Sequence, residues 1–106
     1  MYPFVIISTT FEDKKDGEKI VRSLLSEKLI ACAQLSSPIT SYYRWDGDIA
    51  SSTEFILTLK TTEALCERVK TRLKKTHPYQ LPEIVVQAVT GSSVEYTEWV
   101  ENEVEK

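Results

Sequence analysis

The spacing of hydrophobic positions changes along the chain, and these changes predict the order of its elements. Residues 4–7 are consecutive and apolar, which is typical of a strand buried on both faces. From residues 20 to 29 the apolar positions recur every three or four residues, which predicts an amphipathic helix that opens after Asp13. Residues 31–45 predict an extended segment with a break at Pro38, because proline cannot donate to a β-ladder.

The second half begins with a hairpin. Asp46 and Gly47 form a two-residue turn signal, since a type I′ turn needs positive φ at both central positions. Residues 49–60 predict the returning strand, with side chains alternating between two faces. A second helix is expected from Thr62, a suitable N-cap, and it must stop before Pro78.

Residues 83–90 predict a last strand, and Gly91 followed by two serines predicts a turn that caps a third helix. The resulting order is β-α-β-β-α-β-α. This order predicts an α+β fold of the ferredoxin-like, split β-α-β type (βαββαβ), with an antiparallel sheet and a C-terminal helix. Right-handed crossovers place the first two helices on one face of the sheet. The length of 106 residues predicts one domain spanning residues 1–106.

This architecture leaves apolar surface uncovered in a single chain. The first and last strands are apolar on both faces, and Phe4, Ile6, Ile56 and Val85 add to the face that two helices do not cover. Large exposed apolar patches mark interaction surfaces. The third helix can cover part of the patch, and we expect burial against further copies to cover the rest.

Charge and composition narrow the function classes. The formal net charge is −3, which disfavours general binding to nucleic acid or to an anionic membrane. No apolar run approaches the ~20 residues needed to span a bilayer, and no signal-peptide pattern opens the chain, so a cytoplasmic location is expected. Cys32 and Cys66 lack Cys-x-x-Cys spacing, and free thiols are expected in that compartment.

The densest polar cluster lies between the second helix and the last strand. His77, Tyr79 and Glu83 supply an imidazole, a phenol and a carboxylate, and Pro78 and Pro82 hold the segment extended. The cluster can form one wall of a site. It can also be only a helix stop followed by a strand entry, and the sequence leaves both alternatives open.

The hairpin supplies further candidates. Aromatic side chains beside a turn are good cross-strand packers, the role expected for Tyr43, and good binding anchors, the role expected for Trp45. Lys60 ends its strand on the side of Ile56, where it can either snorkel to water or contact an anion at a pocket mouth. We expect the Lys60 ammonium to meet the segment 77–83 in space.

The sequence contains residues that could bind a metal ion, but they do not have the spacing of known metal sites. Cys32 and His77 would suit copper or zinc, and the carboxylates of Asp46 and Asp48 are the next candidates. Cys32 can equally be a small buried hydrophobe. The chain has no Gly-rich phosphate loop and one histidine, so no catalytic constellation is evident and we expect no enzyme.

Four ordered segments resemble the CutA family of divalent-cation tolerance proteins. They are KLIACAQ from residue 28, ITSYYRWDGDI from residue 39, LKT from residue 59 and HPYQLPEI from residue 77. The resemblance implies a cytoplasmic, PII-like homotrimer that is not an enzyme and is linked to tolerance of copper or other divalent cations. The family's motif carries over onto Cys32, Arg44, Trp45, Lys60, His77, Tyr79, Pro82 and Glu83.

Two other functions remain open beside a metal-binding tolerance factor. One is a PII-like sensor whose intersubunit pocket binds a small anionic ligand. The residues expected to line that pocket are Arg44, Trp45, Lys60, Tyr79, Pro82 and Glu83. The other is a trimeric scaffold that presents the aromatic hairpin to a protein partner.

Overall fold

A computed structural model describes residues 2–106 and confirms the predicted order of elements. The elements are β1 (Val5–Phe11), α1 (Lys14–Ser26), β2 (Cys32–Leu35), β3 (Ile39–Trp45), β4 (Asp48–Thr61), α2 (Glu63–Thr76), β5 (Val85–Ala88) and α3 (Val94–Glu103). The break at Pro38 divides the predicted second strand into β2 and β3. The last strand is shorter than expected, since only residues 85–88 pair with β1.

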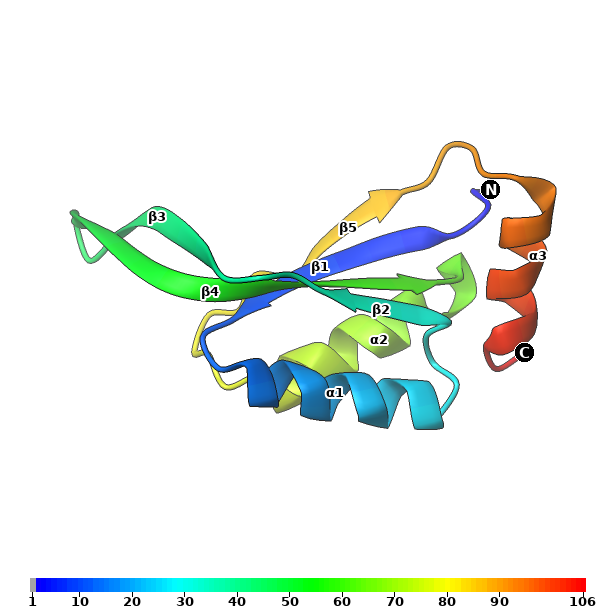
Figure 1. The fold of residues 1–106 in the computed structure, drawn as a ribbon, viewed down its shortest axis with the longest axis horizontal. Helices are drawn as coiled ribbons and strands as arrows, with labels where there is room; N and C mark the ends of the chain where they lie inside the picture. Colours follow the sequence, from blue (N-terminus) through cyan, green and yellow to red (C-terminus); the bar gives the residue numbers. More distant parts are fainter. Residues whose placement is uncertain (1) are drawn as a thin grey trace.

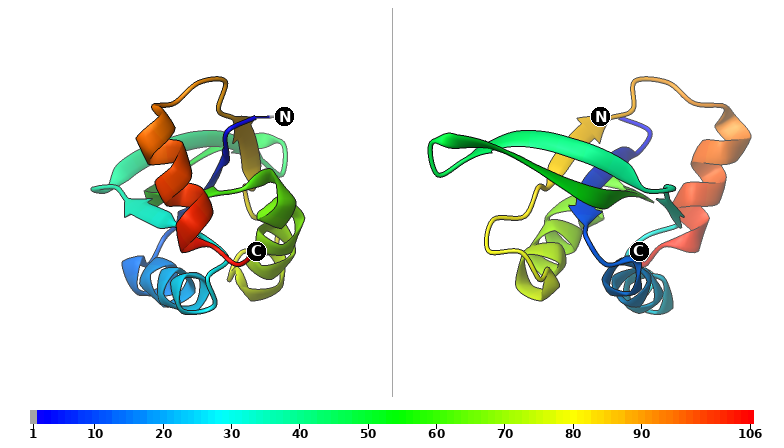
Figure 2. Two further views of the ribbon diagram at one scale, coloured as in Figure 1. Left: turned by 90° about the vertical axis from the view of Figure 1, so that its right-hand side faces the viewer. Right: turned by 60° about the vertical axis from the view of Figure 1, so that its left-hand side comes forward.

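The strands form one antiparallel sheet in the order β2-β4-β1-β5, and β3 pairs with β4 off this path. Helices α1 and α2 lie together on one face of the sheet, as the right-handed crossovers require, and α3 stands across one end (Figure 1). Figure 2 shows the same layers from two other directions. None of the helices within residues 2–106 has the length and apolar character needed to cross a membrane.

The strand β4 belongs to two parts of the molecule. Its second half pairs with β1, from Phe55 opposite Phe11 to Thr61 opposite Val5. Its first half pairs with β3 as far as Trp45 opposite Asp48, and this half projects from the body as a hairpin (Figure 1). The body therefore ends where the hairpin begins, and a groove forms at that junction.

Local signals in the sequence explain where these elements begin and turn. The Asp13 side chain accepts a hydrogen bond of 2.9 Å from the Lys15 amide and so caps α1. The hairpin turn has φ of 50° at Asp46 and 78° at Gly47, the positive values that a type I′ turn requires. Thr62 occupies the N-cap of α2 but makes no side-chain capping bond.

The core lies between the sheet and the helices α1 and α2. Its fully buried side chains include Ile7, Phe11, Leu24, Leu29, Leu57, Leu59, Val69 and Leu73. The opposite face is less exposed than the sequence suggested, because Phe4 is buried with its ring 5.8 Å from that of Tyr96 on α3. Exposed apolar surface remains on the edge strand β5, where Val85 is 46% and Val86 37% exposed.

Candidate functional site

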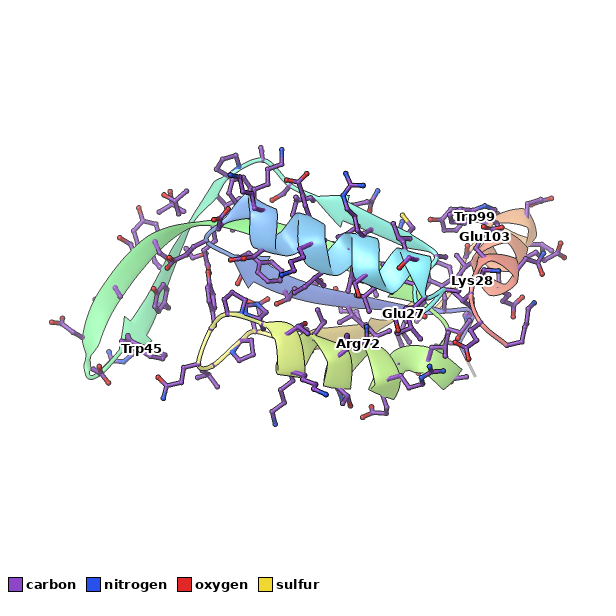
Figure 3. The ribbon with its side chains drawn as sticks, turned by 90° about the horizontal axis from the view of Figure 1, so that it is seen from below. Glu27, Lys28, Trp45, Arg72, Trp99 and Glu103 are labelled. Carbon is purple, nitrogen blue, oxygen red and sulfur yellow. The ribbon has the colours of Figure 1, made fainter. Side chains whose placement is uncertain are left out.

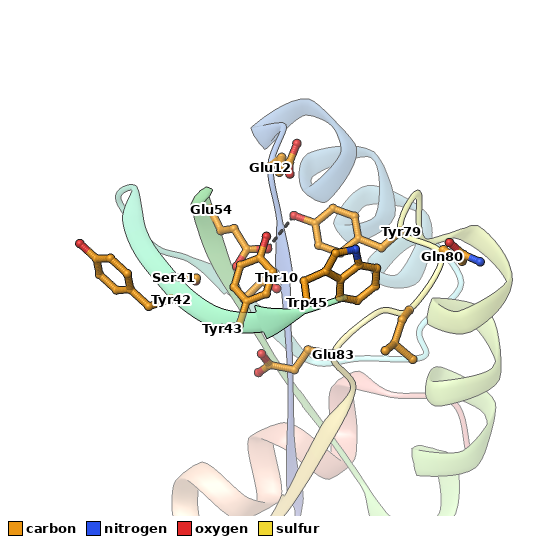
Figure 4. Close-up of a pocket in the computed structure, with 11 residues that line it drawn as sticks. Thr10, Glu12, Ser41, Tyr42, Tyr43, Trp45, Glu54, Tyr79, Gln80 and Glu83 are labelled. Carbon is orange, nitrogen blue, oxygen red and sulfur yellow. Dashed lines mark hydrogen bonds between the residues drawn. The ribbon is translucent and has the colours of Figure 1, made fainter. Parts of the chain in front are cut away.

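A groove of about 520 Å³ lies where the hairpin leaves the body (Figure 4). Its walls come from the end of β1, both strands of the hairpin and the segment 77–83. The lining residues are Thr10, Glu12, Ser41, Tyr42, Tyr43, Trp45, Glu54, Tyr79, Gln80, Leu81 and Glu83. Three of these residues are glutamates and four are aromatic, and none is a lysine or an arginine.

The carboxylate of Glu54 is the most buried charge of the groove, with the residue 8% exposed. The Tyr79 hydroxyl donates a hydrogen bond of 2.7 Å to Glu54 Oε2 (Figure 4). Burial acts to raise the pKa of Glu54, but hydrogen bonds from Ser41, Tyr79 and Thr10 outweigh it and leave the pKa below its usual range. Glu54 is therefore ionised at neutral pH.

Tyr79 holds this carboxylate in place. Burial, together with the hydrogen bond to Glu54 and the charge of that carboxylate, strongly raises the pKa of Tyr79. The phenol therefore stays protonated and donates at any physiological pH. A neutral donor fixes the carboxylate but leaves its negative charge uncompensated.

His77 lies behind Tyr79 and is only 8% exposed. The Tyr79 amide donates to His77 Nδ1 at 3.1 Å, so Nδ1 is an acceptor. Nε2 then carries the proton and donates to the Thr10 carbonyl oxygen at 2.9 Å. The ring stacks on Phe11 with a centroid distance of 4.3 Å.

This geometry gives His77 a structural role. Both ring nitrogens are occupied by the chain, which leaves no lone pair for a metal ion. Burial lowers the pKa of His77, so the ring is neutral because it is buried and not because it binds a metal ion. His77 is therefore not placed to bind a metal ion in this structure, contrary to the role that the sequence suggested. The alternative interpretation, a helix stop followed by a strand entry, fits this residue.

The structure brings only some of the expected pocket residues together. Trp45, Tyr79 and Glu83 line the groove. Arg44 faces the other side of the hairpin, because its side chain alternates with that of Trp45 along the strand. Pro82 shapes the segment 77–83 without lining the groove.

Lys60 does not meet the segment 77–83 within one chain. It lies opposite Ile6 on β1, whereas the segment contacts Thr9 and Thr10. Three to four residues of strand separate these positions, a distance of roughly 10–13 Å. The Lys60 ammonium instead lies 3.2 Å from the Tyr96 hydroxyl and 5.2 Å from the centroid of that ring. The register of β1 and β4 thus removes the expected anion contact from the groove.

The candidate metal ligands are also separated. Cys32 pairs with Lys60, at the end of the sheet away from His77. Asp46 lies in the exposed turn and Asp48 follows it, where Asp48 Oδ1 accepts a hydrogen bond from the Ile49 amide. Among residues 2–106, no group of three or more His, Cys, Asp and Glu side chains is placed to hold a metal ion.

Sequence reasoning missed Glu54 and Glu12 as groove residues. Glu54 precedes the apolar run of β4, where a charge is usually a solvated strand end. The available signal was its position on the face shared by Ser41, which the hairpin register implies. Its partner Tyr79 is distant in sequence, so this hydrogen bond had no sequence signal.

The fold and the groove together define a small ferredoxin-like protein with a projecting hairpin and an aromatic, acidic groove at its base. Comparison with known proteins identifies the family within this class. The model of the family described as CutA1 divalent ion tolerance protein matches residues 5–103. The chain belongs to the CutA1 family of divalent ion tolerance proteins.

Individual relatives agree with this assignment. The chain is 40% identical over 102 residues to the divalent-cation tolerance protein CutA of Pyrococcus horikoshii, covering 96% of this chain and 99% of that protein. It is 33% identical over 100 residues to the chloroplastic protein CutA of Arabidopsis thaliana, covering 94% of this chain but only 55% of that longer protein. The crystal structure of the divalent ion tolerance protein CutA1 from Ehrlichia chaffeensis superimposes with a TM-score of 0.93 at 33% identity, covering 100% of this chain and 99% of that one.

Proposed function

We propose that this protein acts in the tolerance of divalent cations as a cytoplasmic, non-catalytic homotrimer that binds copper weakly. The observation that carries the proposal is the family match over residues 5–103, together with a full-length relative named for divalent-cation tolerance. Free thiols at Cys32 and Cys66 are compatible with a reducing compartment.

Two surfaces support assembly into a trimer. Among residues 2–106, the edge strand β5 pairs with β1 alone, and it exposes Val85 and Val86. Open strand edges with apolar side chains are normally covered in soluble proteins. The hairpin projects from the body and exposes Tyr42 and Ile49 on the face that Arg44 shares, which gives a second surface for a neighbouring copy.

Light scattering tests the assembly. We expect a particle of three times the 12.1 kDa chain mass. Val85→Asp should weaken the assembly, because a charge at the edge of β5 would have to be desolvated at the contact. Val94→Asp is the matched control, since Val94 is exposed on α3. A monodisperse monomer of the parent protein at micromolar concentration would contradict the trimer.

Copper binding is proposed to use Cys32 for Cu⁺ and the carboxylates of Asp46 and Asp48 for Cu²⁺. Cys32 is half-buried on the sheet face away from α1 and α2, and a thiolate is the ligand that Cu⁺ prefers. One thiol per chain makes an incomplete site, so neighbouring copies would have to share the ion. Such a site is open and water-accessible, which explains why the proposed binding is weak.

Calorimetry with both copper ions separates these ligands. Cys32→Ser should abolish binding of Cu⁺, and Asp46→Asn with Asp48→Asn should weaken binding of Cu²⁺. Cys66→Ser is the matched control, because burial raises the pKa of the Cys66 thiol and makes it a poor ligand. Equal Cu⁺ affinity of the two cysteine variants would refute the role of Cys32.

A further inference from the structure

The groove holds a buried negative charge without a basic partner. Glu54 is a charged residue with 8% exposure, and buried charges are normally paired with an opposite charge. The ion pairs in the described part of the chain join Arg68 with Glu105, Lys70 with Glu67 and Arg72 with Glu27. Glu54 therefore relies on neutral hydrogen-bond donors alone, and its charge remains available to a ligand.

The other lining groups point to the same kind of ligand. Glu12 and Glu83 add negative charge to the rim of the groove, and no lysine or arginine lines it. Tyr43, Trp45 and Tyr79 line the same groove as Glu54, and the Tyr79 hydroxyl bonds to its carboxylate (Figure 4). Aromatic faces attract cations through their quadrupole, most strongly when the cation also loses water.

We propose that this groove binds a small organic cation of the substituted ammonium class, with the charge directed to Glu54 and the alkyl groups against Trp45 and Tyr79. The chemistry goes beyond metal-ion tolerance. It also differs from the small anionic ligand that the sequence suggested for an intersubunit pocket, because an anion in this groove of one chain would meet three carboxylates.

The dimensions favour an organic cation over a bare metal ion. A volume of about 520 Å³ is within the range of small-molecule sites. No three metal-ligating side chains of the described residues converge in it. A substituted ammonium ion fills more of this space and uses the aromatic walls, which a hydrated metal ion does not.

Choline and its uncharged carbon analogue, dimethylbutanol, form a matched pair of probes. The two molecules have nearly the same shape, so a difference in affinity reports the charge. Trp45 lies on the hairpin and Trp99 on α3, at opposite ends of the molecule (Figure 3). In the Trp99→Phe protein the tryptophan fluorescence therefore reports only the groove.

We expect choline to change the Trp45 fluorescence with a Kd in the millimolar range or below, and dimethylbutanol to bind at least about tenfold more weakly. Glu54→Gln keeps the shape of the side chain and should raise the Kd for choline by about tenfold or more. Glu98→Gln on α3 is the matched control, because it removes an equal charge far from the groove, and it should leave the Kd unchanged.

Calorimetry on Trp45→Leu provides a second route that does not depend on Glu54→Gln folding. We expect a weakening of roughly 2- to 30-fold, the effect of one aromatic contact with a cation. Equal affinity for choline and dimethylbutanol would overturn the proposal. It would also be overturned if choline bound equally well to the parent and to both groove variants, or if none of the probes bound.

Discussion

His77 offers the sharpest test of the structural interpretation of the groove wall. Replacing it with alanine removes a buried ring that stacks on Phe11, and it leaves the Thr10 carbonyl and the Tyr79 amide without their partners. Loss of the buried ring and of these hydrogen bonds should lower the free energy of unfolding by about 3–5 kcal/mol. Such a loss is a large fraction of the stability of a typical domain.

The matched variant is His77→Phe, which keeps a ring against Phe11 but cannot bond to Thr10 or Tyr79. We expect it to lose about 2 kcal/mol, less than the alanine variant. Urea denaturation at one fixed protein concentration measures both changes, because assembly makes the midpoint depend on concentration. A loss below about 1 kcal/mol for His77→Ala would refute the structural role.

The pH dependence provides an independent readout. Burial lowers the pKa of His77 below its ordinary value of 6.5, so the folded protein binds this proton more weakly than the unfolded chain. The contribution of neutral His77 to the free energy of unfolding should be fully present above pH 6.5. It should be lost as the pH drops from that value through the lowered pKa. His77 is the only histidine of the chain, so this decline should disappear in His77→Phe. If the decline persists in that variant, another group causes it.

Three further predictions concern the ion pair between the helices, the turn and the groove. Arg72 on α2 donates a hydrogen bond of 2.8 Å to Glu27, the C-cap of α1 (Figure 3), and lowers the pKa of Glu27 to about 2. Arg72→Met should therefore return that pKa toward 4.5 in an NMR titration. Gly47→Ala should destabilise the protein by about 1 kcal/mol in urea denaturation, because φ at Gly47 is 78° although the space for a methyl group is open. Tyr79→Phe should raise the pKa of Glu54 in an NMR titration and cost about 1–2 kcal/mol in urea denaturation, since the carboxylate loses its phenol donor.

Local chemistry explains why so much of the fold could be predicted. The start of the first helix after Asp13, the break at Pro38 and the turn at Gly47 each depend on a few adjacent residues, and each is present in the structure. The order of elements and right-handed crossovers then fix the sheet and the side on which the two helices lie. The last strand is shorter than the sequence predicts, because pairing to β1 rather than propensity determines its ends.

The candidate site could be predicted only in part, because it depends on strand register. Trp45, Tyr79 and Glu83, three of the residues that the sequence singles out, line one groove. The strand-end position of Lys60 predicts that it lines the same pocket, but the ladder with β1 sets it opposite Ile6. Glu54 was missed for the converse reason, since the register brings it to Tyr79. A pattern along one strand gives the face of a residue but not its position along the neighbouring strand.

Strand register also places the two proposed binding sites at opposite ends of one sheet. Cys32 and Lys60 lie in one cross-strand row that ends near Tyr96, whereas Glu54 and Tyr79 lie beyond the other end of the ladder with β1. Sites farther apart than about 7–10 Å without shared partners usually respond independently. Within one chain, the proposed copper ligand Cys32 and the proposed cation groove should therefore act independently. Cys32→Ser should leave choline binding unchanged, and Glu54→Gln should leave Cu⁺ binding unchanged. Calorimetry of each ligand with each variant measures this, and a Cys32→Ser protein that loses choline binding would mean that the two sites are coupled, either through the sheet or through a neighbouring copy.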